Sequence, residues 1–143
     1  MKKFFSGLFF VSVFTLLSTA GALGDDLENL SGRWLSKKTI DDGRTITQTI
    51  EIKKDKLTFE IKNKDGKAIL YAEGNIKLET LGSFKTMKVF DIKAGESAAE
   101  TESVDGNRTS IYQFSGGTWT LASNFDAVRD EKPSVDVYTK EGK

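Results

Sequence analysis

The side chains that most often carry catalysis are missing from this sequence of 143 residues, which contains no histidine and no cysteine. Without them, no Ser–His or Cys–His pair activates a nucleophile, and no imidazole or thiolate binds a metal. Two carboxyl groups about 5 to 10 Å apart still perform acid–base chemistry in glycosidases. The acidic residues here stand mainly in turns or at outward strand positions, namely Asp41, Asp42, Asp55, Asp65, Asp105, Glu51 and Glu60. We therefore predict no catalytic residues and a protein that is not an enzyme.

Calcium is the remaining metal to consider, because its ligands are oxygen atoms. The densest acidic turn is Asp41-Asp42-Gly43. This turn lacks the regular spacing of an EF-hand loop, and aspartate and glycine are the usual residues of tight turns. We predict no metal site and no cofactor.

One polar residue stands among apolar neighbours at a position where a strand would face inward. Gln48 lies on the face that also carries Ile46, Ile50 and Ile52. A buried amide needs a hydrogen-bond partner. That partner is either another group of the protein or a ligand in a cavity, and the sequence leaves both open.

Small side chains give a second indication of a cavity. Three of them alternate along residues 68–76 and would leave volume inside a barrel, although close packing against Trp34 would use the same space. The predicted cavity residues are Gln48, Phe59, Ala68, Leu70, Ala72, Gly74 and Trp119. Trp119 has a second interpretation, because it alternates with Leu121 and would equally pack in the core.

The segments that carry these residues are expected to be strands, because apolar side chains alternate with polar ones at a period of two. The pattern is clearest in T-I-T-Q-T-I-E-I-K (residues 45–53) and K-L-T-F-E-I-K (residues 56–62). Turn residues such as Asp42-Gly43 and Gly116-Gly117 separate such segments. The remaining strands are expected at residues 33–40, 68–78, 84–93, 109–114, 118–124 and 134–139.

About eight strands joined as consecutive hairpins predict an all-β domain. Closure into an antiparallel up-and-down β-barrel hides every strand edge and encloses side chains or one small ligand. A two-sheet sandwich is the alternative. Residues 25–30 are long enough for one helical turn. We expect residues 94–107 to form a mobile loop or a weak edge strand, and residues 125–133 to form a polar connection.

The N-terminus has the features of a signal peptide. Two lysines precede an apolar run over residues 4–17, and the small residues Ala20 and Ala22 fit the cleavage rule. The run is shorter than the about 20 residues that a membrane-spanning helix needs. We therefore expect residues 1–22 to be removed and residues 23–143 to form one exported domain, in the periplasm or outside the cell.

The charge of the expected mature domain is close to balanced. Cleavage after Ala22, or after Gly24 as the alternative, leaves 19 basic and 21 acidic side chains and a net charge of −2. Nucleic acids and anionic membranes both require a positive excess. We expect neither as a partner, and no integral membrane span after cleavage. Since no disulfide is available, the core must support the fold alone.

The segment Leu30-Ser31-Gly32-Arg33-Trp34 resembles the G-x-W signature of the lipocalin group. Glycine lets the chain bend tightly into a barrel, and the tryptophan packs across its closed end. Most of the remaining chain is similar to small secreted bacterial lipocalin-like, or calycin-type, domains of uncharacterised function. The segments that carry this similarity are Glu73-Gly74, residues 111–117 with Leu121, and Lys132-Pro133.

Two features depart from true lipocalins. These proteins commonly place an arginine near the last strand, where it stacks on the tryptophan, and the candidate here is Arg129. They also usually carry a disulfide, which a chain without cysteine cannot form. The resemblance therefore implies a barrel closed by Gly32 and Trp34, and it leaves the ligand class open.

Two functions remain open at this stage. In the first, the protein is a carrier or sensor that holds one small apolar or amphipathic molecule inside the barrel. In the second, it is an envelope or extracellular module with a filled core, and loops such as residues 94–107 bind another protein or a glycan. The state of the barrel interior, open or filled, separates the two.

Overall fold

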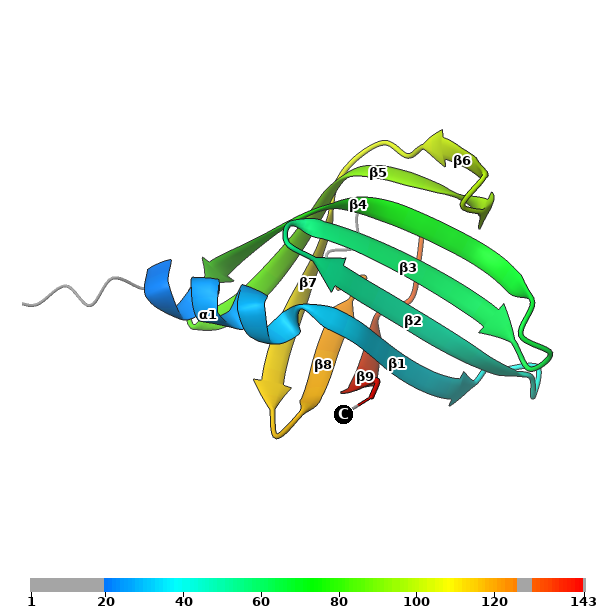
Figure 1. Cartoon of the computed structure of the whole chain (residues 1–143), viewed down its shortest axis with the longest axis horizontal. Coiled ribbons are helices and arrows are strands. Elements are labelled where there is room, and N and C mark those ends of the chain that lie inside the picture. The colour runs from blue at the N-terminus through cyan, green and yellow to red at the C-terminus, as the bar shows by residue number, and fades with distance from the viewer. Residues whose placement is uncertain (1–19, 126–129, 143) are drawn as a thin grey trace, which may run out of the picture.

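The computed structural model describes residues 20–125 and 130–142, which contain one helix and nine strands (Figure 1). The helix is α1 (Ala20–Leu30). The strands are β1 (Gly32–Thr39), β2 (Thr45–Lys53), β3 (Lys56–Asn63), β4 (Ala68–Leu81), β5 (Phe84–Ser97), β6 (Glu100–Ser103), β7 (Arg108–Ser115), β8 (Thr118–Ser123) and β9 (Ser134–Lys140).

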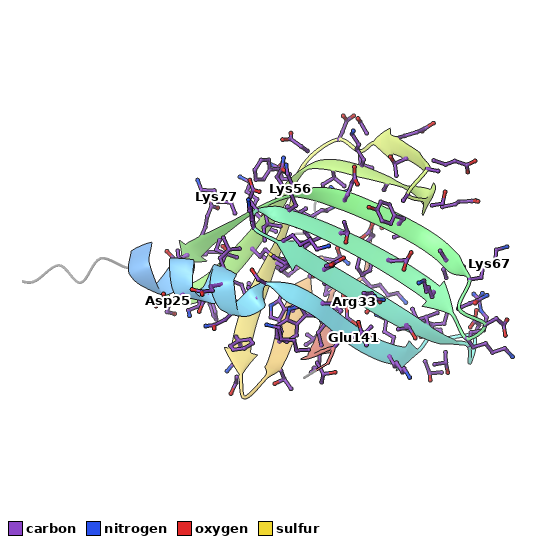
Figure 2. All side chains as sticks on the ribbon, viewed as in Figure 1. Asp25, Arg33, Lys56, Lys67, Lys77 and Glu141 are labelled. Atoms are coloured by element: carbon purple, nitrogen blue, oxygen red, sulfur yellow. The ribbon has the colours of Figure 1, made fainter. Side chains whose placement is uncertain are left out.

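Eight of these strands close into an antiparallel barrel in up-and-down order. The order around the barrel is β1, β2, β3, β4, β5, β7, β8 and β9, and β9 returns to β1. The closing contact is short and includes the pair Trp34 and Lys140. An ion pair supports it, with Arg33 Nε 2.9 Å from Glu141 Oε2, and Figure 2 shows the two residues near each other. The predicted all-β up-and-down barrel is confirmed, and the sandwich alternative is wrong.

Period-two alternation explains which face of each strand is inside. Ile50 and Ile52 of β2 pair in register with Phe59 and Leu57 of β3. Phe59 in turn pairs with Ala72 of β4. A slip of one residue would turn all these side chains to the solvent, so burial of the apolar face fixes the register.

The ninth strand, β6, lies outside the closed barrel and beside the second half of β5 (Figure 1). Among the described strands it pairs only with β5. A Cβ atom on Gly95 would lie 1.7 Å from the carbonyl oxygen of Glu100, so a glycine is required where the two backbones meet. The first part of the segment expected as a loop, residues 94–107, therefore extends β5 to Ser97, and β6 forms the edge strand. Its small polar residues show no alternation, and pairing with neighbouring strands decides its conformation.

The core occupies the end of the barrel next to α1. Leu30, Trp34 and Trp119 are completely buried there. The ring of Trp34 makes edge-on contacts with Phe114 and Trp119, at centroid distances of 5.7 and 5.6 Å. We call Trp34, Phe114 and Trp119 the aromatic floor, because they close this end of the barrel.

Helix α1 is longer than the single turn expected at residues 25–30, and it runs along the closed end (Figure 1). Asp26 Oδ2 accepts hydrogen bonds from Lys85 Nζ at 2.7 Å and from the Tyr112 hydroxyl at 2.8 Å. These contacts attach the helix to β5 and β7 within the turn that was expected, and residues 20–24 extend the helix before it. Most of the expected signal peptide, residues 1–19, lies outside the described residues. In the part of the chain that the structure describes, no helix is long and apolar enough to cross a membrane.

The residues of the G-x-W segment meet the end of β9. Gly32 has a φ of 118°, which favours glycine, and a Cβ atom there would lie 3.0 Å from Cε of Lys140. Lys140 Nζ lies 5.3 Å from the ring centroid of Trp34 and donates a hydrogen bond to the carbonyl oxygen of Asn29. A cation thus covers the tryptophan, and sequence reasoning did not identify it. The residue considered for that role, Arg129, lies outside the described residues.

Candidate functional site

A cavity of about 590 Å³ lies inside the barrel, above the aromatic floor. All eight barrel strands contribute to its wall. It opens toward the end opposite α1, because its lining includes Lys38 near the end of β1 and the first residues of β7 and β9, Arg108 and Ser134. In Figure 2 this end of the barrel is marked by Lys67 and the closed end by Asp25. The volume is typical of small-molecule sites, which span about 300 to 1,000 Å³.

One half of the wall is apolar. It is formed by the inward faces of β2, β3, β4 and β5, and β2 and β3 have the clearest alternation in the sequence. Its side chains are Ile50, Leu57, Phe59, Ile61, Leu70, Ala72, Met87, Val89, Ile92 and Ala94. This half supplies a broad surface for an apolar molecule.

The other half is polar, and its centre is β9. The inward residues of this strand are Ser134, Asp136 and Tyr138, which all line the cavity. The outward residues Val135 and Val137 are 68% and 51% exposed. Strand β9 is therefore inverted relative to the usual arrangement, with its polar side chains inside the barrel and its valines outside.

Hydrogen bonds join the polar groups of this wall to one another. The Tyr138 hydroxyl donates to Oε1 of Gln48 at 3.3 Å, and Lys38 Nζ lies 2.8 Å from Oδ1 of Asp136. The hydroxyl groups of Ser110 and Ser123 are 2.8 Å apart. Such pairing offsets much of the cost of removing these groups from water.

Tyr138 has a perturbed acidity that follows from its position. Burial raises the pKa of its hydroxyl well above the ordinary value of 10.0, and the negative charge of Asp136 raises it further. The phenol therefore remains protonated at neutral pH and acts as a hydrogen-bond donor to Gln48.

The structure brings together four of the seven predicted cavity residues, namely Gln48, Phe59, Leu70 and Ala72. Ala68, at the start of β4, is not part of the lining. At Gly74 a Cβ atom would lie 2.9 Å from Cγ1 of Val89 and 3.0 Å from the carbonyl oxygen of Phe90, so β5 already occupies the space beside this glycine. Trp119 is completely buried in the aromatic floor.

Sequence reasoning missed the polar half of the wall. The alternation in S-V-D-V-Y-T-K suggests that the valines face inward, but pairing of Tyr138 with Trp119 turns Asp136 and Tyr138 inward instead. The aromatic residue at position 138 was the one available indication, since a large ring is costly to leave exposed.

The fold and the cavity together define a class of protein: an up-and-down antiparallel β-barrel of eight strands with an internal cavity open at one end. Within the described residues, no group of three or more acidic side chains is placed to hold a metal ion. No family model, curated protein or solved structure matches the chain.

Proposed function

We propose that this protein is an exported, lipocalin-like binding protein that holds one small apolar or amphipathic molecule in its barrel and catalyses no reaction. The observation that carries the proposal is the internal cavity of about 590 Å³. A protein that used its barrel only as a rigid scaffold for binding loops would gain stability from a filled interior. The open interior therefore favours the carrier over the module with a filled core.

The composition of the wall supports the same proposal. Apolar surface removed from water contributes about 25 cal/mol per Å², so the apolar half supplies most of the driving force for binding. The polar half supplies hydrogen-bonding groups that orient the ligand. We expect dissociation constants in the micromolar range for a molecule that fills the cavity, that is, about −8 kcal/mol.

Uptake of the neutral fluorescent probe N-phenylnaphthylamine tests this function. We expect saturable fluorescence enhancement with protein produced from the full sequence and purified without detergent. Ala72→Trp should abolish the enhancement, because its side chain projects into the cavity. The matched control is Ala122→Trp, because Ala122 lies on the outward face of β8 opposite Val135. This variant should show the same fluorescence enhancement as the native protein. Circular dichroism must show native β-structure for both variants.

Two results would contradict the proposal: no uptake by the native protein, or equal uptake by both variants. Native mass spectrometry of the same preparation provides an independent check. A bound molecule from the host appears as a mass excess that disappears on denaturation.

Export is the second part of the proposal. Both expected cleavage positions, after Ala22 and after Gly24, lie within the first half of α1. Asp26 and Leu30, which attach the helix to the barrel, follow both positions. N-terminal sequencing of protein from the cell envelope or medium should begin at Leu23 or Asp25. Recovery of the whole chain in the cytoplasm, beginning at Met1, would contradict export.

A further inference from the structure

Gln48 has hydrogen-bonding capacity that the protein does not use. Its side chain lines the cavity although only 6% of the residue is exposed. Its Oε1 atom accepts a hydrogen bond from Tyr138. Its Nε2 group has no hydrogen-bond partner among the described residues. Nε2 is not among the described side-chain atoms that are fully buried without a partner, so it faces the open space of the cavity, where a ligand with an acceptor atom can accept its hydrogen bond.

The charged groups around the cavity do not favour an anion. The basic residues in the described part of its lining are Lys38 and Arg108, and Arg108 Nη1 donates to the carbonyl oxygens of Asp105 and Asn107. Lys38 is already paired with Asp136, whose side chain is only 14% exposed. Both basic side chains of the described lining therefore already have partners, which a carboxylate inside the barrel would have to replace.

A cation is not favoured either. Asp136, a largely buried acidic group in the wall, holds Lys38 at 2.8 Å. A cationic ligand would have to replace that lysine, and it would leave the ammonium group without its partner. The polar half of the cavity is therefore best matched by an uncharged polar group.

The positions of the strands indicate where the polar and apolar groups of such a molecule lie. Strands β4 and β9 are four positions apart in the ring of eight, so they face each other across the cavity. Strand β4 contributes Leu70, Ala72 and Glu73, whose carboxylate accepts a hydrogen bond from Tyr71, and β9 contributes Ser134, Asp136 and Tyr138. A ligand between them has one apolar side and one polar side.

We infer that the barrel selects an uncharged amphiphile with a hydrogen-bond acceptor oxygen, such as a ketone, an ester or an alcohol. Gln48 Nε2 donates to that oxygen, and the apolar body lies against Phe59, Leu70 and Ala72. This inference rests on the proposed carrier function and specifies its ligand class.

Competition with bound N-phenylnaphthylamine tests the inference with two molecules of equal chain length, methyl nonyl ketone and undecanoate. We expect the ketone to displace the probe at a concentration at least about tenfold lower than undecanoate at neutral pH. Gln48→Leu preserves most of the side-chain volume and removes the amide. It should weaken binding of the ketone about tenfold, which corresponds to about 1.4 kcal/mol. The affinity of the variant for the probe is measured first, and the competition data are corrected for it.

Gln113→Leu is the matched control, because Gln113 is an exposed glutamine on the outward face of β7. This substitution should change the affinity for neither the ketone nor undecanoate. The preference of the native protein for the ketone is measured without any variant, so the test remains decisive if Gln48→Leu does not fold.

The inference is overturned if the probe binds but undecanoate competes as well as the ketone. It is also overturned if folded Gln48→Leu retains full affinity for the ketone. In both cases the carrier function stands, because the probe is still bound. Failure of the native protein to bind the probe or either competitor overturns the carrier function together with the inference.

Discussion

The indole nitrogen of Trp34 donates a 2.8 Å hydrogen bond to the carbonyl oxygen of Leu30, the last residue of α1. Both residues are completely buried. The bond therefore satisfies a carbonyl at the end of a helix, where the helix itself supplies no donor. It also joins α1 to the first strand at the aromatic floor.

Trp34→Phe should lower the free energy of unfolding by about 2 to 3 kcal/mol. Loss of the donor leaves a buried carbonyl unpaired, and the smaller ring leaves space beside Trp119. Urea unfolding followed by circular dichroism measures the change. Val135→Ala serves as the control, since a surface substitution is expected to stay within about 0.5 kcal/mol. Equal effects of the two substitutions would show that the floor contact does not stabilise the fold.

Asp26→Ala should detach α1 from the barrel. Its carboxylate accepts hydrogen bonds from both Lys85 and Tyr112, and its side chain is 13% exposed. We expect a loss of about 1 to 2 kcal/mol, because hydrogen bonds to charged groups are among the stronger ones but Lys85 is partly solvated. Hydrogen exchange in α1 should rise at the same time. Asp25→Ala, at the exposed neighbouring position, should leave both measurements unchanged.

Gly95→Ala should release β6 without opening the barrel. The new methyl group would lie 1.7 Å from the Glu100 carbonyl oxygen, so the β5–β6 pairing must separate. The eight strands of the barrel close without β6. Hydrogen–deuterium exchange should accelerate over residues 100–103, while β2 and β3 stay protected. Ser103→Ala, an exposed position on the same strand, is the control. Continued protection of residues 100–103 in Gly95→Ala would contradict the close approach of these two backbones.

Stability should fall at high pH because of the buried tyrosines. Burial raises the pKa of Tyr138 above 10.0, and burial together with Asp26 raises the pKa of Tyr112. The unfolded chain then loses these protons at lower pH than the folded chain does. The stabilising contribution is therefore complete below about pH 10 and declines as the pH rises beyond it.

Urea unfolding between about pH 9 and about pH 11 measures this decline. Tyr138→Phe should be less stable at every pH, because Gln48 loses its donor, but its stability should depend less on pH in the alkaline range. The same alkaline decline in the native protein and in Tyr138→Phe would show that ionisation of Tyr138 does not contribute.

Local pattern was enough to predict the apolar part of the barrel wall in β2 and β3. The alternation over residues 45–53 and 56–62 placed Ile50 and Phe59 inside, and both line the cavity. The resemblance of residues 32–34 to the G-x-W signature implied that Trp34 packs across a closed end, and Trp34 is completely buried. These predictions succeed because burial of apolar side chains is the largest favourable contribution to folding. The spacing of those side chains at a period of two can be read directly from the sequence.

The conformations of α1, β6 and β9 depend instead on distant residues. Helix α1 is attached to the barrel by Asp26, which contacts Lys85 and Tyr112, both more than 50 residues away in the sequence. Strand β6 forms because Gly95 allows its backbone to approach that of Glu100 closely. The alternation of apolar residues does not predict this contact.

The sequence by itself determined an all-β chain of alternating strands, the tryptophan at the floor and the apolar half of the cavity. Only the tertiary structure decided that β9 places Asp136 and Tyr138 inside and Val137 outside. The reason is that closure of the barrel pairs Tyr138 with Trp119 and places Lys38 beside Asp136. These contacts outweigh the burial of two valines, and no local pattern contains them.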